Sequence, residues 1–287
     1  MDFVTETIAR SDQRAISVDV FRPAANGAGA TVILLHGGGW RFGDRSAMHG
    51  YARLLAEKGF LAIAAQYGLL PDVRWPGQLE DVRAVIRWVK ANAPRLNVDP
   101  AKVATIGFSA GGHLALLAAG TSDGSGYEQV LGNGAGTSVA AVVSCFAPPS
   151  LTSRDWQGRP PQVDMLLDGG GEERARALSP ITYVNPAFPT PFLLAGAADI
   201  GLPVTATLGL YAALSEAGVH PELHILHAQN HEFSALPSMI GGFVDEVAFF
   251  LRRVVVEPEH FAEEDRRLNL FSQPERLKAL LAGKPAV

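Results

Sequence analysis

Several residue types and patterns are scarce in this 287-residue chain, and each scarcity excludes a class of function. The single cysteine, Cys145, cannot form an internal disulfide, which fits a reducing compartment, and its apolar neighbours predict a buried core side chain. The 24 Lys and Arg residues are outnumbered by 29 Asp and Glu residues, so the chain lacks the basic footprint of a nucleic-acid-binding protein.

Long apolar runs are also missing. No segment has the roughly 18 uncharged apolar residues that a membrane span requires. The most apolar stretch, residues 243–256, contains four charged side chains and predicts an amphipathic helix packed on a sheet. Residues 1–6 have neither the basic start nor the apolar core of a secretory signal. We therefore expect a cytoplasmic protein that has no membrane or nucleic-acid partner.

The most informative pattern that is present is G-F-S-A-G at residues 107–111. The β-branched run Val103–Ile106 before it predicts a buried strand, and residues 113–119 after it favour a helix. Ser109 is therefore expected on a strand-to-helix turn so sharp that the backbones on either side nearly touch, which requires glycine at 107 and 111. The helix N-terminus would favour negative charge developing near Ser109, as a nucleophile requires.

A second glycine-rich motif, H-G-G-G-W at residues 36–40, follows the buried-strand pattern Thr31–Leu35. Its glycines allow a tight loop with exposed N–H groups. We expect those of Gly38, Gly39 and Ala110 to form an oxyanion hole, with His36 bracing the loop through a backbone hydrogen bond. The alternative is a glycine loop without a chemical role.

Together the two motifs resemble those of the α/β-hydrolase superfamily. The likeness is to bacterial esterases similar to hormone-sensitive lipase and to small feruloyl- and acetylesterase-like enzymes with an H-G-G-G-W loop. It covers about residues 15–255 and includes the stretches 67–76 and 97–102, although Gly68 stands where that group commonly has arginine. The resemblance implies an α/β-hydrolase fold and serine-dependent hydrolysis.

A serine nucleophile needs a base and an orienting acid, which follow it in this fold in the order acid, then histidine. Residues 196–203 resemble the family's G-x-x-D-x-x-V-P loop and make Asp199 the candidate acid. An alternative role for Asp199 is to cap the helix that starts near Pro203. His231 precedes Phe233 as in the family's G-H-x-F loop, with Asn230 in place of glycine, and is the candidate base.

Two other histidines are alternative candidates for the base. His227 lies four residues before His231, nearer the end of the preceding strand, and lacks the following phenylalanine. His113, one turn after Ser109, is expected to pack inside the protein.

Along the chain, strand patterns alternate with helix patterns, which predicts a mostly parallel sheet with helices on both faces. The first two strands, near 3–8 and 15–22, have no helix between them and predict an antiparallel edge. The helical stripe at residues 79–89 is expected to be core. The main strands are expected near residues 30–36, 60–66, 102–107, 138–146, 191–196 and 221–227.

We expect one α/β-hydrolase domain over residues 1–256 and a charged extension over 257–287 with a short helix near 274–281. Residues 147–188 interrupt the alternation and suggest a small cap, with a surface excursion as the alternative. Trp156 and residues 165–167 in that segment are candidate pocket-lining residues. The other candidates for binding substrate border the motifs: Trp40, Tyr67, Phe108, Leu202 and Phe233.

These patterns predict a serine carboxylesterase that acts on small to medium esters through an acyl-enzyme, with no metal or organic cofactor. The same residues would serve an amidase or arylformamidase, since they also resemble kynurenine formamidase. A non-catalytic binding module is the alternative from another class. The tail after residue 256 also suggests a homodimer contact.

Overall fold

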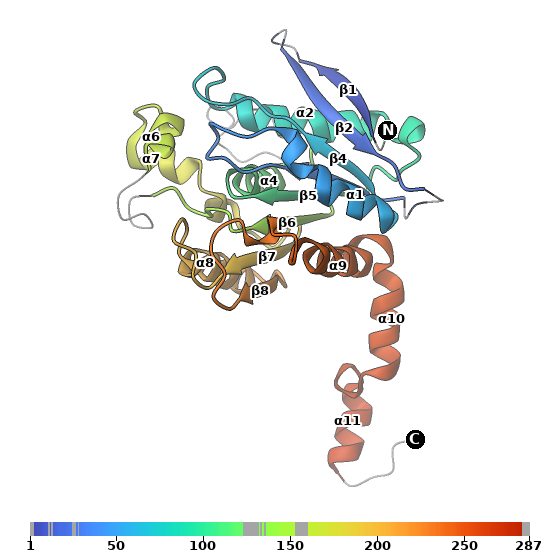
Figure 1. Ribbon diagram of the computed structural model, residues 1–287. Helices are drawn as coiled ribbons and strands as arrows, with labels where there is room; N and C mark the ends of the chain where they lie inside the picture. The colour runs from blue at the N-terminus through green and yellow to red at the C-terminus, as the bar shows by residue number, and fades with distance from the viewer. Residues whose placement is uncertain are drawn as a thin grey trace.

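The fold is a central sheet covered by helices on both faces, with an arm that extends from the C-terminus (Figure 1). It is seen in a computed structural model that describes residues 3–10, 12, 14–24, 27, 29–122, 132, 134, 136–152 and 160–282. The described strands form one sheet in the order β1-β2-β4-β3-β5-β6-β7-β8. Their bounds are Val4–Ala9, Ala15–Phe21, Thr31–Leu35, Leu61–Ala65, Val103–Phe108, Ala141–Cys145, Thr190–Gly196 and Glu222–Leu226, from β1 to β8.

The two ends of the sheet differ in strand direction. β1 pairs antiparallel with β2, and β2 pairs antiparallel with β4, as the missing helix between β1 and β2 predicts. From β4 to β8 every pairing is parallel. The carboxyl ends of six neighbouring strands, β3 to β8, therefore meet at one edge, where ligands bind in open α/β sheets. The predicted α/β-hydrolase architecture is confirmed.

Side chains of the central strands point alternately to the two faces of the sheet and pack into two separate hydrophobic cores. Ile33 and Leu35 of β3 pack with α2, α4 and α8, whereas Val32 and Leu34 pack with α1 and α9 on the other face. The predicted stripe on α2 is buried, as a helix with one apolar face on a sheet requires. These five helices span His49–Glu57 (α1), Gly77–Ala91 (α2), Ala110–Gly120 (α4), Val204–Glu216 (α8) and Ile240–Leu251 (α9).

Short helices fill the connections. α3 (Ala93–Leu96) follows α2, and one π-helical turn, Arg252–Val256, extends α9. The interrupting segment carries α6 (Pro161–Leu167), α7 (Gly171–Ala177) and a 3₁₀ turn, Pro180–Tyr183. Trp156, a candidate pocket residue in this segment, lies outside the described residues.

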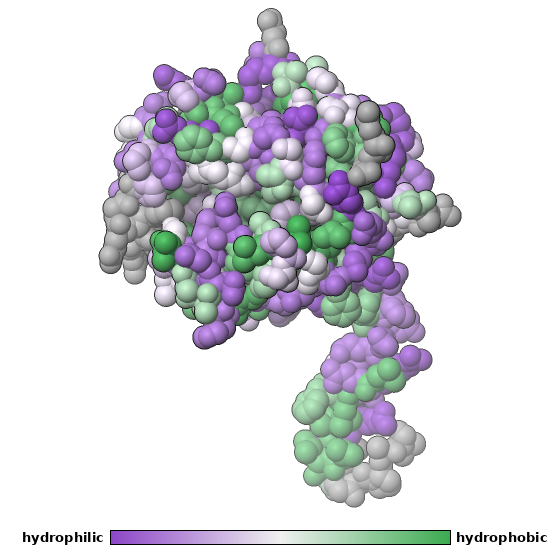
Figure 2. Space-filling model, viewed as in Figure 1, coloured by the Kyte–Doolittle hydropathy of each residue, from purple (hydrophilic) through white to green (hydrophobic). Residues whose placement is uncertain are grey.

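The C-terminal arm consists of α10 (Pro258–Leu268), a 3₁₀ turn and α11 (Pro274–Leu281), and it points away from the sheet (Figure 1). α11 agrees with the predicted short helix, whereas α10 was not predicted. No residue of α10 is buried. Apolar side chains lie open on the arm, with Leu268, Phe271 and Leu281 exposed at 66%, 80% and 78%, and they form an apolar surface in Figure 2.

Candidate active site

Ser109 lies on a strained turn between β5 and α4. Its φ is 51° and its ψ is −116°, a conformation that L-residues rarely adopt and that is found mainly at functional sites. A Cβ on Gly107 would lie 2.3 Å from the carbonyl oxygen of Gly111, and a Cβ on Gly111 would lie 2.3 Å from that of Leu35. The backbones therefore approach as closely as predicted, and only glycine fits at either position.

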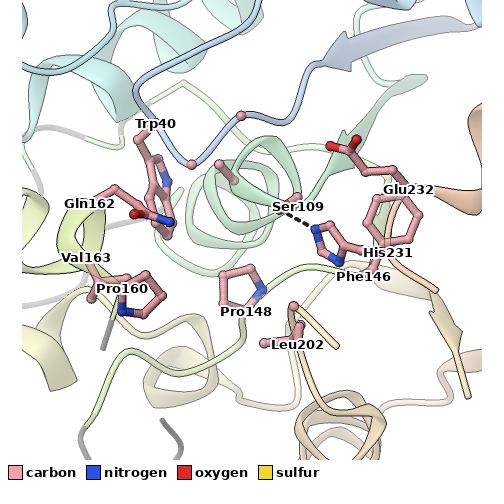
Figure 3. A pocket seen from close by; sticks show the side chains of 14 residues that line it. Trp40, Ser109, Phe146, Pro148, Pro160, Gln162, Val163, Leu202, His231 and Glu232 are labelled. Atoms are coloured by element: carbon pink, nitrogen blue, oxygen red, sulfur yellow. Dashed lines mark hydrogen bonds between the residues drawn. The ribbon is translucent and has the colours of Figure 1, made fainter. Parts of the chain in front are cut away.

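Hydrogen bonds join Ser109, His231 and Asp199 in series. The Nε2 atom of His231 is 3.0 Å from Ser109 Oγ, as drawn in Figure 3, and its Nδ1 is 2.7 Å from Asp199 Oδ2. Because an ionised carboxylate can only accept, Nδ1 carries the proton and Nε2 is free to accept from the serine hydroxyl. The three predicted residues, far apart in sequence, are thus in contact.

The Asp199 carboxylate is held ionised. Burial alone would raise its pKa, but the hydrogen bond with His231 and those from backbone N–H groups outweigh burial and lower it. Its Oδ1 accepts from the N–H groups of Gly201 and Leu202, at 2.8 Å each. The residue before α8 is Pro203, which makes no side-chain cap, so Asp199 does not cap that helix. The fixed carboxylate orients the imidazole of His231.

Asn230 ties the acid and histidine loops together. Its Oδ1 accepts from the N–H of Ile200 at 3.0 Å and from the N–H of His231 at 2.8 Å. Glycine, which the family motif has at this position, could make neither contact. His227, the alternative base, is exposed and makes no hydrogen bond with Ser109 among the described residues.

The H-G-G-G-W loop turns sharply beside Ser109. Gly38, Gly39 and Trp40 all have positive φ, and a Cβ on Gly38 would lie 2.1 Å from the carbonyl oxygen of Phe42. Neither Gly38 nor Gly39 donates its N–H to a backbone carbonyl of the described residues. The N–H of Ser109 itself is bonded to the carbonyl of Cys145 at 2.9 Å, which leaves Ala110 as the first free donor of α4.

Two buried aromatic groups support this loop from inside. The Nδ1 of His36 is 2.7 Å from the carbonyl oxygen of Gly37, a bracing contact of the predicted kind. Tyr67 stacks on His36 with ring centroids 4.4 Å apart and donates its hydroxyl to the His36 carbonyl at 2.8 Å. Tyr67 was predicted to line the substrate pocket, but it is buried beneath the loop and lines neither cavity that is described below.

His113 links the loop to the interrupting segment. The Nε1 of Trp40 donates to His113 Nδ1 at 3.3 Å, and His113 Nε2 donates to the carbonyl of Leu178 at 2.7 Å. Burial lowers the pKa of His113 to about 4, and the bond to Leu178 opposes this shift only in part. As predicted, His113 is a packing residue, and its neutral tautomer fixes the indole of Trp40.

A cavity of about 320 Å³ opens over Ser109 and His231 (Figure 3). Gly38, Gly39 and Ala110 line it, as do Trp40 and Leu202, two of the predicted substrate-binding residues. The interrupting segment and the strand ends contribute further lining residues, which are Phe146, Pro148, Pro160, Gln162, Val163, Gly201 and Glu232. Most of this lining is apolar, so the cavity suits an organic group of modest size.

A second cavity, of about 310 Å³, adjoins the first one and shares Gly38, Phe146 and Glu232 with it. Phe108 lines this second cavity and not the first. Phe233, also predicted to bind substrate, is buried and lines a separate cavity beside α9 and not the one over Ser109. Its side chain belongs to the core between the sheet and α9, where it packs near Phe146.

Comparison with known proteins places the chain in a family. The sequence profile of the BD-FAE family matches residues 18–214, more than half of the chain. This chain belongs to the BD-FAE family. Esterase LipC of Mycobacterium tuberculosis is 31% identical over 245 residues, which are 81% of this chain and 60% of the relative. The probable carboxylic ester hydrolase LipM of the same organism is 30% identical over 242 residues, 78% of this chain and 55% of the relative.

Solved structures agree on the fold of this BD-FAE-family chain, which spans only 55–60% of the length of LipC and LipM. A thermophilic esterase from Thermogutta terrifontis, Est2, superimposes with a TM-score of 0.73 at 22% identity and covers 88% of this chain and 92% of its own. The same esterase phosphonylated by sarin gives a TM-score of 0.75. At this identity the likeness concerns the α/β-hydrolase fold.

The described residues contain no group of three or more His, Cys, Asp or Glu side chains that could hold a metal ion. No helix in the same part of the chain is long and apolar enough to cross a membrane.

Four residues that line the cavities were not predicted from the sequence. Phe146 and Glu232 border both cavities, and Pro148 and Gln162 line the first one. Glu232 directly follows the candidate base, and Phe146 is the last residue of a predicted strand, so only their places beside these features pointed to the site.

Proposed function

We propose that this protein is a serine carboxylesterase that hydrolyses small to medium carboxylic esters. The observation that carries the proposal is the position of His231, within hydrogen-bond reach of both Ser109 Oγ at 3.0 Å and Asp199 Oδ2 at 2.7 Å. That arrangement makes a serine hydroxyl a nucleophile at neutral pH. The names of LipC and LipM, both esterases, support the same reaction class.

In the proposed reaction, Ser109 Oγ attacks the ester carbonyl carbon while its proton passes to His231 Nε2. The tetrahedral intermediate collapses, the C–O bond to the alcohol breaks, and His231 returns the proton to the departing oxygen. Water then attacks the acyl-enzyme with His231 again as base, which releases the acid and restores Ser109. Asp199 stays ionised throughout and stabilises the imidazolium.

The oxyanion is assigned to three backbone donors, the N–H groups of Gly38, Gly39 and Ala110. All three residues line the cavity with Ser109. The N–H groups of the two loop glycines donate no hydrogen bond to a backbone carbonyl of the described residues. Removing one such donor from an oxyanion hole costs about 3 kcal/mol of transition-state stabilisation. No metal ion or organic cofactor is needed for these steps.

We further assign residues 1–256 to the catalytic domain and residues 147–188 to a small cap. The cap assignment is supported by Pro160, Gln162 and Val163, which close one side of the cavity over Ser109. Trp156 and residues 165–167 are proposed to take part in it. A lone buried cysteine fits a cytoplasmic site of action. The exposed apolar side chains of the 257–282 arm fit a contact in a homodimer.

The test combines labelling with turnover. A fluorophosphonate probe should label Ser109 in the folded wild-type protein and leave a Ser109→Ala variant unlabelled. The wild type should also hydrolyse p-nitrophenyl acetate. Equal labelling of the two proteins would overturn the assignment of the nucleophile, and faster turnover of N-formylkynurenine than of any ester in a chain-length series would replace esterase by amidase.

A further inference from the structure

The second cavity combines an aromatic wall with a carboxylate. Tyr51 and Phe146 both pack against Phe108, with ring centroids 4.6 Å and 6.0 Å from its own, and all three line the cavity. Met48 adds a thioether side chain. Glu232 supplies the carboxylate at the boundary with the first cavity. Aromatic faces beside a carboxylate are favourable surroundings for an organic cation.

The Glu232 carboxylate has no protein partner in the described part of the chain. No hydrogen bond or ion pair of the described residues includes its oxygens. The backbone at Glu232 has φ 59°, and Oε1 lies 3.2 Å from the place that a Cβ on Gly37 would take. In Figure 3 the carboxylate is directed away from the His231 ring. Glu232 is exposed beside the oxyanion loop, so its carboxylate is open to a ligand that enters from solvent.

The charge of the two cavities is otherwise close to neutral. Neither cavity has a lysine or arginine among its described lining residues. Burial lowers the pKa of His36, so its imidazole is neutral at pH 7 and does not neutralise Glu232. The guanidinium of Arg41 lies over the ring of Phe42, 5.3 Å from its centroid, so Phe42 is left out of the proposed wall.

This charge has a cost for neutral substrates. A carboxylate near Gly38 opposes the negative charge that develops on the carbonyl oxygen during attack by Ser109. A positive charge carried by the substrate into the second cavity would cancel that opposition and would also gain from the aromatic faces.

We propose that the second cavity binds an alkylated ammonium group and that the substrates include esters that carry one. This inference rests on the proposed esterase function and deepens it. The ester carbonyl lies at Ser109 in the first cavity, and the ammonium group reaches past Gly38 and Phe146 to Glu232. Glu232 then determines specificity and takes no part in proton transfer.

The test uses pairs of esters that differ only in charge. Acetylcholine is compared with 3,3-dimethylbutyl acetate, which places the charge on the alcohol side. Ethyl betaine is compared with ethyl 3,3-dimethylbutanoate, which places it on the acyl side. For each pair the ratio of kcat/KM is measured in the wild type and in Glu232→Gln, so that the intrinsic reactivities of the esters cancel. We expect the ratio to fall about tenfold in the variant for at least one pair, in proportion to the lost attraction between the two charges.

A matched control removes a charge from α6, the helix whose Gln162 and Val163 line the first cavity. Asp164 is exposed on α6 and lines neither cavity, so Asp164→Asn should keep the wild-type ratio. If Glu232→Gln leaves both ratios unchanged, or if Asp164→Asn lowers them equally, the ammonium site is wrong even though p-nitrophenyl acetate is still hydrolysed.

A second readout does not depend on turnover. Tetramethylammonium should bind the wild type in a calorimetric titration and bind Glu232→Gln at least fivefold more weakly. Equal binding to both proteins would overturn the inference. If no ester is hydrolysed and the probe does not label Ser109, the proposed function fails. The titration still shows whether the second cavity binds an ammonium ion.

Discussion

The two halves of the candidate site reach the same edge of the sheet by different means. Ser109 follows β5, whose residues are all buried, and the turn is fixed by backbone contacts that only glycine permits. Asp199 and His231 follow β7 and the half-exposed edge strand β8, and side-chain oxygens of Asp199 and Asn230 connect their loops. Steric fit therefore determines one half, and a few hydrogen bonds determine the other, so substitutions should affect the halves differently.

The largest expected effect is a loss of turnover, and it should follow from substitutions in either half of the site. Ser109→Ala or His231→Ala should each lower kcat for p-nitrophenyl acetate by about a million-fold, because either change removes the proton-coupled attack. Asp199→Asn should lower kcat by about ten thousand-fold, since the imidazole loses its orienting acceptor. An Asp199→Asn variant with wild-type kcat would show that this aspartate is not the acid.

Substitutions at the turn around Ser109, the half that is fixed by steric fit, should lower the stability of the fold. Gly111→Ala would place a Cβ 2.3 Å from a backbone oxygen, and we expect the free energy of unfolding to fall by about 3 kcal/mol in urea titrations. Gly209 in α8 has nothing within 4 Å of its Cβ position, so Gly209→Ala should raise stability by up to about 1 kcal/mol. Similar changes in the two variants would refute the steric explanation.

His113, which lies in α4 after the same turn, should make the folded protein less stable in acid. The folded protein holds the pKa of this histidine at about 4, against 6.5 for the free side chain, because burial disfavours the charged ring. As pH falls from 6.5 to 4, the unfolded chain takes up a proton that the folded chain does not, so the wild type should lose about 3 kcal/mol of stability from this group. His113→Gln should lack this component when unfolding free energies at pH 7 and pH 4 are compared. A wild-type difference no larger than that of the variant would contradict the assignment.

Substitutions in the hydrogen-bonded half should lower activity more than stability, and this is the smallest of the expected effects. Asn230→Ala removes the acceptor shared by Ile200 and His231, and we expect kcat/KM to fall about tenfold with a smaller loss of stability than in Gly111→Ala. Asn230→Asp keeps an acceptor oxygen and should retain more activity. If Asn230→Ala were fully active, the link between the two loops would have no catalytic consequence.

The same contrast explains what could be predicted from the sequence. The strands and the nucleophile turn follow local rules, namely buried β-branched runs and glycines that a close backbone approach requires. Asp199 and His231 could be assigned because both lie in short motifs that directly follow strands. The antiparallel edge followed from the short connection between β1 and β2.

The cavity lining could not be predicted in the same way. Tyr67 and Phe233 border the motifs in sequence, but the first supports His36 and the second packs into the core beside α9. Glu232 and Gln162 reach the cavity from distant segments, and no periodicity in the sequence marks such an approach. Side-chain direction on irregular loops depends on the packing of the whole fold, which a local pattern does not encode.

The strand order has a consequence for how the protein gains activity during synthesis. Ser109 emerges with β5, but its partners follow β7 and β8, the last strands to be made. A growing chain that ends before residue 231 contains Ser109 but not its candidate base. Because chains are made from the N-terminus, ester hydrolysis would report the docking of β8 onto β7. Two inactive fragments, divided after β6, would recover activity only by completing one sheet.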